Sequence, residues 1–233
     1  MILLKTIEKP ITIEKGDDFK AIFSKYGCLA FDRQENLSEL IGDLVGEIDL
    51  ENGTLTFSDD IKFDIQILGF FTEEFNQWSW AWDNENIGFD DEFIKAACEI
   101  YEIGAEYEIP EFTTPVFETK FDDCHIWAMT ASALLDMDAY YAANVEGLDI
   151  FVAIKSDSIK RNDSVVKFRD TFNTFQKNFS VYPRLAFEGY TKLKGYEFKN
   201  KDDFAVAKLG EDRIIAGFTE RGNLTHLQML TVD

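Results

Sequence analysis

Alternating tryptophans in residues 77–84 limit the possible folds more than any other stretch of the chain. The segment reads Gln-Trp-Ser-Trp-Ala-Trp-Asp-Asn, so Trp78, Trp80 and Trp82 stand at every second position. A period of two is typical of a β-strand, and it places all three indoles on one face of that strand. The opposite face has a serine and an alanine at its centre, which lets a helix or a second layer approach closely.

Three further runs of alternating apolar residues precede this strand. Residues 48–50 and 55–57 alternate on either side of Asn52-Gly53, a pair that favours a tight hairpin turn. Residues 61–67 show the cleanest alternation in the chain, with isoleucine and phenylalanine on one face and polar residues on the other. Four successive antiparallel strands therefore predict a meander with one buried face.

Helical periodicity occurs on both sides of this meander and again near the C-terminus. We expect helices at residues 19–30, 37–44, 90–104, 122–134 and 165–179, an extended connector at 108–117, and strands at 148–154, 185–190, 194–198, 204–209, 213–219 and 224–230. The predicted fold class is α+β, an antiparallel meander with helices packed mainly on one face, followed by a smaller helix-and-meander unit.

A polar segment at residues 155–164 coincides with a change in charge and predicts a domain boundary. Residues 1–159 hold 34 acidic and 10 basic side chains, whereas residues 160–233 hold 10 acidic and 13 basic ones. We expect an acidic α+β domain at residues 1–157 and a second unit at 160–233, which can also pack with the first as one domain.

The formal net charge of −21 restricts the classes of partner. Such a surface repels the phosphates of nucleic acids and anionic membranes, and it attracts basic proteins or cations. We therefore expect no nucleic-acid or membrane partner and favour a basic protein. The sequence does not indicate an oligomeric state.

The chain lacks the features of a secreted or membrane protein. Its first apolar run is too short for the core of a signal peptide, and no stretch reaches the roughly 18 apolar residues of a membrane span. Cys28, Cys98 and Cys124 are an odd number without paired spacing, which predicts reduced, mostly buried thiols. These features predict a cytoplasmic protein.

Groupings that carry catalysis or bind metal are also missing. His125 and His226 are about 100 positions apart, and the adjacent Cys124 and His125 at a helix start point in different directions. Four acidic pairs stand at expected helix starts or in a turn, where local capping explains them without a metal. They are Asp17-Asp18, Asp59-Asp60, Asp90-Asp91 and Asp122-Asp123. We expect no metal and no cofactor, and we do not favour an enzyme.

The aromatic residues allow two interpretations. The three indoles either form an exposed stacking platform for a flat ligand or fill the core between sheet and helices, and we favour the core. Asn84 either belongs to that platform or fixes the turn after the strand. Two tyrosines further along the chain either line a pocket or pack beside the core. The candidate binding residues are Trp78, Trp80, Trp82, Asn84, Tyr140 and Tyr141.

The motif W-x-W-x-W-x-N resembles the signature of a bacterial family of uncharacterised domains. Supporting segments are residues 48–57, 67–69 and 138–141, and the resemblance covers roughly residues 15 to 155. The family has no established activity, so the resemblance implies kinship and no particular chemistry.

Three classes of function remain. The favoured class is a non-enzymatic binding protein, of the immunity type that neutralises a basic toxin, because catalytic groupings are missing and the surface is acidic. The second is a small-molecule binder or unrecognised enzyme with an aromatic pocket near Trp78, Trp80 and Trp82. The third is a structural or housekeeping protein whose acidity serves solubility alone. A neighbouring gene for a secreted toxin would separate the first class from the others.

Overall fold

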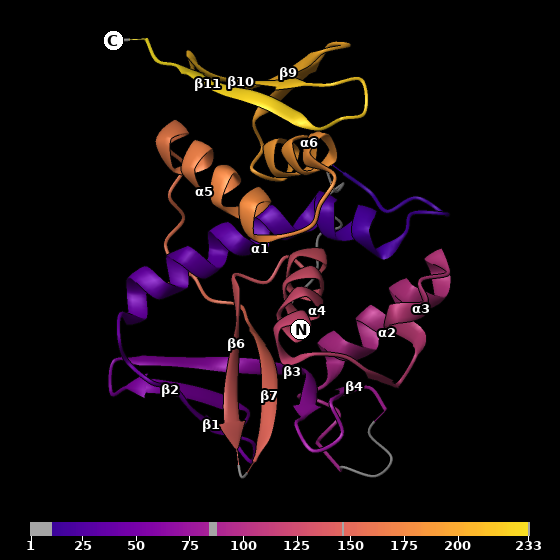
Figure 1. Ribbon diagram of the computed structural model, residues 1–233. Coiled ribbons are helices and arrows are strands. Elements are labelled where there is room, and N and C mark those ends of the chain that lie inside the picture. The colour runs from indigo at the N-terminus through magenta and orange to yellow at the C-terminus, as the bar shows by residue number, and fades with distance from the viewer. Residues whose placement is uncertain (1–10, 84–87, 146, 233) are drawn as a thin grey trace. The chain divides into compact units, whose positions relative to one another are not determined.

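The computed structural model describes residues 11–83, 88–145 and 147–232 (Figure 1). The chain divides into two compact units. We call residues 29–162 the acidic unit, and residues 11–28 with 163–232 the small unit. The helix α1, Phe19–Ile41, contributes its first part to the small unit and the rest to the acidic unit. The separate domains expected at 1–157 and 160–233 stay a prediction, with the difference that residues 11–28 group with the C-terminal part of the chain.

The acidic unit is built on a seven-stranded sheet in which every strand pair of the described residues is antiparallel. Five strands follow one another in the order β1-β2-β3-β4-β5, and β7 pairs with both β3 and β6. The strands are β1 Glu47–Asp49, β2 Thr54–Ser58, β3 Ile61–Thr72, β4 Gln77–Trp80, β5 Val116–Glu118, β6 Ala139–Val145 and β7 Leu148–Ile154. The predicted four-strand meander and the α+β class are confirmed.

The predicted hairpin joins β1 to β2. Ile48 pairs with Leu55, and the carboxylate of Asp49 accepts hydrogen bonds from the backbone N–H groups of Glu51 and Asn52 at 3.0 Å. Gly53 closes the turn with a φ of +61°, a conformation that favours glycine. Local side-chain hydrogen bonds therefore stabilise the turn that sets the register of the first two strands.

The helices of the acidic unit differ from the expected ones at three points. The stretches expected at 19–30 and 37–44 are one continuous helix, α1. The helix expected from residue 90 begins at Lys95, because Ile67 N–H donates to Phe93 O at 2.7 Å and ties the preceding segment to β3. The connector expected at 108–117 contains a helical turn, for which Pro110 has the right φ in advance, and a short strand. The helices after α1 are α2 Lys95–Tyr107, α3 Pro110–Thr113 and α4 Phe121–Leu134.

The sheet of the acidic unit is buried on both faces along β7. Ile150 and Val152 belong to a cluster that includes Leu37 of α1 and Ala97 of α2. The intervening Phe151 points to the other face, where its ring meets side chains of α4. Among the described residues, no helix is both long enough and apolar enough to cross a membrane.

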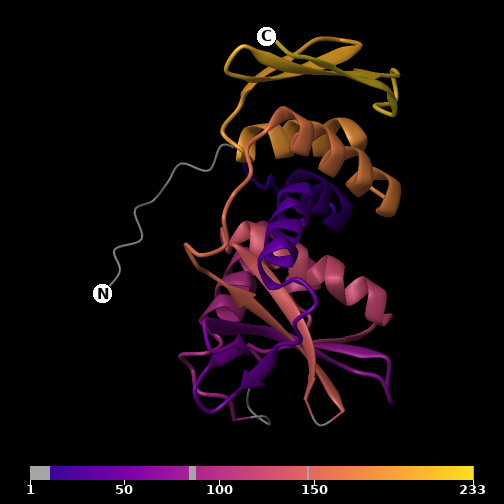
Figure 2. The ribbon, with the colours of Figure 1, turned by 90° about the vertical axis from the view of Figure 1, so that its left-hand side faces the viewer.

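The small unit consists of three layers. The helices α5, Val165–Asn178, and α6, Pro183–Leu193, lie between a four-stranded antiparallel sheet and the first part of α1 (Figures 1 and 2). Rings of Phe23 and Phe175 meet at 5.4 Å on one side of this helical layer, and those of Phe187 and Phe218 meet at 6.3 Å on the other. The strands, in the order β11-β10-β9-β8, are β8 Glu197–Asn200, β9 Phe204–Leu209, β10 Asp212–Phe218 and β11 Leu224–Leu230.

The strand expected at residues 185–190 is wrong, because these residues belong to α6. Ala186, Phe187 and Tyr190 are buried at helical spacing. Gly189 allows the helix to approach α1 closely, since a Cβ at this position would lie 2.1 Å from the backbone oxygen of Lys25. Helical packing within the small unit therefore accounts for the buried residues of this segment.

The tryptophan motif lies mainly in the core, as favoured. Trp78 and Trp80 have no exposed surface, and their rings meet edge to face at 5.1 Å. The Trp80 Nε1–H donates to the Glu111 carbonyl oxygen at 2.8 Å, so its polar atom is satisfied. Gly69 faces them, and a Cβ there would lie 2.5 Å from the Trp78 ring. The expectation that all three indoles share one strand face is wrong, because the strand ends at Trp80 and Trp82 is half-buried in the following turn.

Replacing Trp80 by alanine should lower the free energy of unfolding by about 3–5 kcal/mol, because a fully buried ring leaves a cavity that the sheet and α3 cannot fill. Trp82→Ala should cost less, since that ring is only half-buried. Urea denaturation of both variants checks this order. An unchanged unfolding midpoint for Trp80→Ala, or a larger loss for Trp82→Ala, would contradict the core assignment.

Candidate functional site

The predicted aromatic binding residues do not form one surface. Trp78 and Trp80 offer no exposed ring face in this structure. Trp82 packs against Tyr101 of α2, with ring centroids 4.7 Å apart. Asn84 lies outside the described residues. A stacking platform made of three parallel indoles is therefore not present on the described strand, and Trp82 with Tyr101 is its partly exposed remainder.

Tyr140 and Tyr141 are consecutive residues of β6, so their side chains lie on opposite faces of the sheet. The Tyr140 hydroxyl is hydrogen-bonded to His125 Nδ1 at 2.9 Å, and burial raises the pKa of Tyr140 and lowers the pKa of His125. Both groups are therefore neutral near pH 7. The Tyr141 hydroxyl accepts a hydrogen bond from Gly46 N–H at 3.0 Å, and its ring lies edge-on to Phe57. Each tyrosine thus joins the sheet to a neighbouring segment.

The three cysteines differ in burial and reactivity. Cys124 is buried, its Sγ lies 3.4 Å from the Lys120 carbonyl oxygen, and burial together with Asp123 and Asp149 raises its pKa to about 12. A thiol with such a pKa is not a nucleophile at neutral pH. Cys28 is also buried, whereas Cys98 is exposed, so the expectation of mostly buried thiols holds for two of the three.

Two of the acidic pairs cap local structure. Asp18 Oδ1 accepts a hydrogen bond from Ala21 N–H at the start of α1, and Asp90 Oδ1 accepts one from Glu92 N–H before α2. Within the described part of the chain, no three or more histidine, cysteine or acidic side chains are placed to hold a metal ion. These carboxylates therefore stabilise helix starts and turns.

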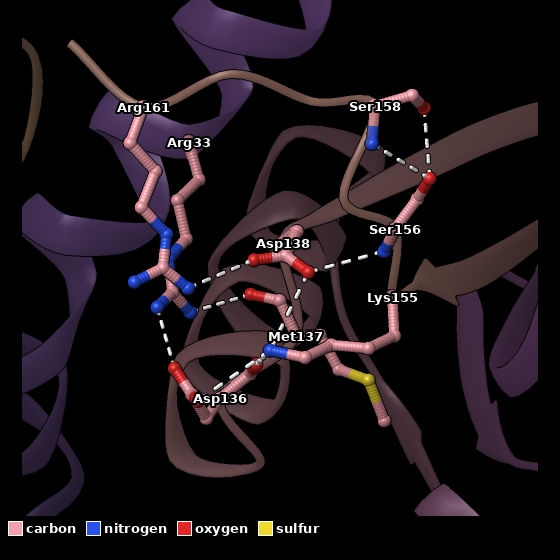
Figure 3. A network of polar contacts seen from close by, with 8 residues as sticks. All are labelled: Arg33, Asp136, Met137, Asp138, Lys155, Ser156, Ser158 and Arg161. Atoms are coloured by element: carbon pink, nitrogen blue, oxygen red, sulfur yellow. Dashed lines mark hydrogen bonds and ion pairs between the residues drawn. The ribbon is translucent and has the colours of Figure 1, made fainter.

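A network of charged residues connects three distant segments of the acidic unit (Figure 3). Arg33 of α1 donates to Asp136 Oδ1 and to the Met137 carbonyl oxygen, in the turn between α4 and β6. Asp138 accepts hydrogen bonds from Arg161 at 3.1 Å and from Ser156 N–H at 3.1 Å. The ammonium of Lys155 lies 3.4 Å from a carboxylate oxygen of each aspartate. We call this network the Asp136–Asp138 clamp.

The clamp is structural in its geometry. The side chains of Arg33 and Asp138 are only 7% and 9% exposed, so each buried charge needs a partner of opposite sign. A cavity of about 230 Å³ adjoins the clamp, and Lys155 and Arg161 at its wall are already paired with the aspartates. The Lys160 ammonium at the same wall donates to the Asp157 carbonyl oxygen at 2.9 Å. The basic side chains that line this cavity therefore stabilise contacts between segments of the acidic unit.

Part of the exposed acidic surface lies on one side of α2. Glu99, Glu102 and Glu106 are exposed and lie about one turn apart, so they form a single negative stripe. The opposite side of the helix is buried through Ala96, Ala97, Ile100 and Gly104. Cys98 and Tyr101 border the stripe, and we call these five exposed residues the α2 acidic face. In the sequence these glutamates stand at i, i+3 and i+7, a spacing that places them on one face of an α-helix.

Nearby negative charges contribute to a raised pKa of Cys98 in the α2 acidic face. The pKa of the Cys98 thiol is raised, first by partial burial and then by the negative charges of Asp91, Glu102 and Glu99. The acidic unit as a whole holds 30 acidic and 7 basic side chains. Three of the seven cations, Arg33, Lys155 and Arg161, belong to the clamp. The ion pair of Lys95 with Glu92, at 3.6 Å, occupies a further one at the start of α2.

The clamp predicts a pH-dependent contribution to stability. Burial acts to raise the pKa of Asp136, but the hydrogen bond and charge of Arg33, with Lys155 and Arg161, lower it overall. A lowered folded-state pKa stabilises the fold above about pH 4, and this contribution is lost as pH falls through the folded pKa. Asp136→Asn should cost about 1–2 kcal/mol at pH 7, moderated by its 58% exposed side chain, and less at pH 3.

Urea unfolding of Asp136→Asn at the two pH values, with Glu74→Gln in an exposed turn as the matched control, measures this difference. A loss of the same size at both pH values, or the same pH dependence in the control, would contradict the clamp's electrostatic role.

The family of unknown function DUF6882 matches residues 20–157 of the chain. No curated protein and no solved structure matches. The matched residues include the tryptophan motif, all seven strands of the larger sheet and the α2 acidic face. Because the match covers more than half of the chain, the expected kinship with a family of uncharacterised domains is confirmed, and the protein belongs to the DUF6882 family, a family of unknown function.

Proposed function

We propose that the protein is a non-enzymatic binding protein whose α2 acidic face docks on a basic surface of another protein. The observation that carries this proposal is that the acidic unit has few basic side chains and that most of those with an ion pair are paired inside the clamp. Seven basic side chains accompany 30 acidic ones, and the clamp alone takes three of the seven. The glutamates of α2 therefore keep an uncompensated negative charge at the surface.

A cationic partner relieves the repulsion within this surface. At physiological ionic strength the Debye length is about 8 Å, so glutamates one helical turn apart still repel one another. A basic partner replaces that repulsion by attraction, and opposite charges also raise the association rate. Binding of this kind weakens as salt is added, which provides a simple diagnostic.

Tyr101 gives the charged stripe an aromatic anchor. Its side chain is 42% exposed, and its ring is held against Trp82. Tyrosine is enriched among the residues that carry most binding energy at protein interfaces, and lysine and arginine bind to aromatic faces. In this proposal Trp82, one of the residues expected to bind a ligand, positions Tyr101 for the partner.

An immunity protein is the specific form of the proposal. Its partner is then a basic toxin that meets the protein in the cytoplasm, and neutralisation requires coverage of the toxin surface without chemistry. The small-molecule alternative has less support, because Trp78 and Trp80 are fully buried.

Replacing Glu99, Glu102 and Glu106 by glutamine tests the docking surface, because glutamine keeps the helix propensity and removes the charge. Affinity capture from the native cell, at about 50 mM and about 200 mM salt, should recover a basic protein with the wild type. Recovery should fall about tenfold or more for the triple variant, the equivalent of about 1.4 kcal/mol or more.

The matched control removes three exposed carboxylates elsewhere in the acidic unit, through Asp59→Asn, Glu73→Gln and Glu74→Gln. This variant has the same net charge and should retain the partner. Equal loss in both variants would mean that net charge alone acts, and capture that ignores salt or recovers anionic proteins would refute the proposal.

A further inference from the structure

We propose that the small unit binds a small organic anion with an apolar body, in a pocket at the start of α6. The pocket encloses about 520 Å³, within the usual range for small-molecule sites. Three cations line it, Lys20 from α1, Arg184 from α6 and Arg221 from the turn after β10. The pocket lies in the small unit, whose basic side chains slightly outnumber its acidic ones. The proposal is independent of the α2 acidic face, which belongs to the other unit.

Arg184 is fixed in place by neutral oxygens. Its guanidinium donates to the Asp202 carbonyl oxygen at 2.7 Å and to Asn200 Oδ1 at 2.6 Å, and it also bonds the Lys201 carbonyl oxygen. The guanidinium carbon lies 5.3 Å from the centre of the Phe218 ring. None of these partners is a carboxylate, so the arginine is oriented and its positive charge is retained.

Lys20 and Arg221 likewise keep their charge. The Lys20 ammonium lies 4.7 Å from the centre of the Tyr182 ring and donates to Ser180 Oγ at 3.1 Å. Arg221 has no hydrogen bond or ion pair with any residue that the structure describes. All three cations of the pocket are therefore available to an anion.

The carboxylates near the pocket are committed elsewhere. Glu188 lines it, but its Oε1 is bound to the Lys192 ammonium at 2.5 Å. Asp18 accepts a hydrogen bond from the Tyr182 hydroxyl at 3.2 Å and caps α1 through Ala21 N–H, without lining the pocket. The balance of charge in the pocket is therefore positive, although the chain as a whole carries −21.

The chemistry of the wall defines the ligand. Val181, Pro183, Leu185 and the Tyr182 ring provide an apolar side, and Asn223 adds an amide next to Arg221. An anionic head group contacts the cations while an apolar body covers this side. Phosphate and carboxylate share the required charge and acceptor oxygens, and arginine binds both in a bidentate manner. The small unit holds 12 acidic and 14 basic side chains, too weak an excess for a nucleic-acid backbone.

Titration of the ¹⁵N-labelled full chain with phenyl phosphate and with phenylacetate tests the site and distinguishes the two head groups. Either compound should shift the backbone amide signals of Gly222 and Asn223 saturably. Benzyl alcohol, which lacks the charge, and inorganic phosphate, which lacks the ring, should each bind more weakly. Arg221→Gln should weaken binding about tenfold, the loss of one charge-assisted contact.

The matched control is Arg213→Gln, which removes an exposed positive charge from β10 outside the pocket and should leave binding unchanged. Tighter binding of either aromatic anion supports the proposal and names the head group. It is overturned by equal weakening in both variants, by equal affinity for benzyl alcohol or inorganic phosphate, or by the absence of saturable shifts at Gly222 and Asn223.

Discussion

Scarcity of positive charge is the constraint on which the acidic unit depends. The unit holds 30 acidic side chains and only seven basic ones. Arg33 and Asp138 are buried, so both need partners of opposite charge inside the unit. The clamp provides these partners by placing three cations around two aspartates. An unpaired buried charge would be strongly destabilising. The glutamates on α2 are left to solvent. The same few cations thus secure the interior and leave the exterior strongly negative.

Local patterns predicted most of the strands and the long helices, because alternation and helical spacing report which faces are buried. They were insufficient where tertiary contacts decide. Trp82 continues the alternation of Trp78 and Trp80, yet the chain turns after residue 80, with Asp83 N–H bonded to the Trp80 carbonyl oxygen at 3.2 Å. Residues 185–190 were expected to form a strand, but they belong to α6, where Gly189 lies against the backbone of Lys25 in α1.

The clamp was beyond prediction from one sequence, because Arg33 and Asp136 are 103 positions apart and nothing local relates them. The α2 acidic face could be predicted from the sequence, since its glutamates recur at helical spacing.

The two units also differ in how they bear on function. The family match includes the acidic unit almost entirely, whereas Arg184 and Arg221 of the small unit lie beyond the matched residues. The proposed docking of a basic protein and the proposed binding of a small anion therefore rest on separate parts of the chain.

The central claim is that negative potential is concentrated on α2 and not spread evenly over the acidic unit. Paramagnetic relaxation of backbone amide protons by a cationic and by an anionic nitroxide, compared residue by residue, measures this potential directly. The account predicts the largest cationic-to-anionic ratio at Glu99, Glu102 and Glu106. Equal ratios at these residues and at the exposed turns around Asp59 and Glu74 would contradict it, and would leave the acidity as a general aid to solubility.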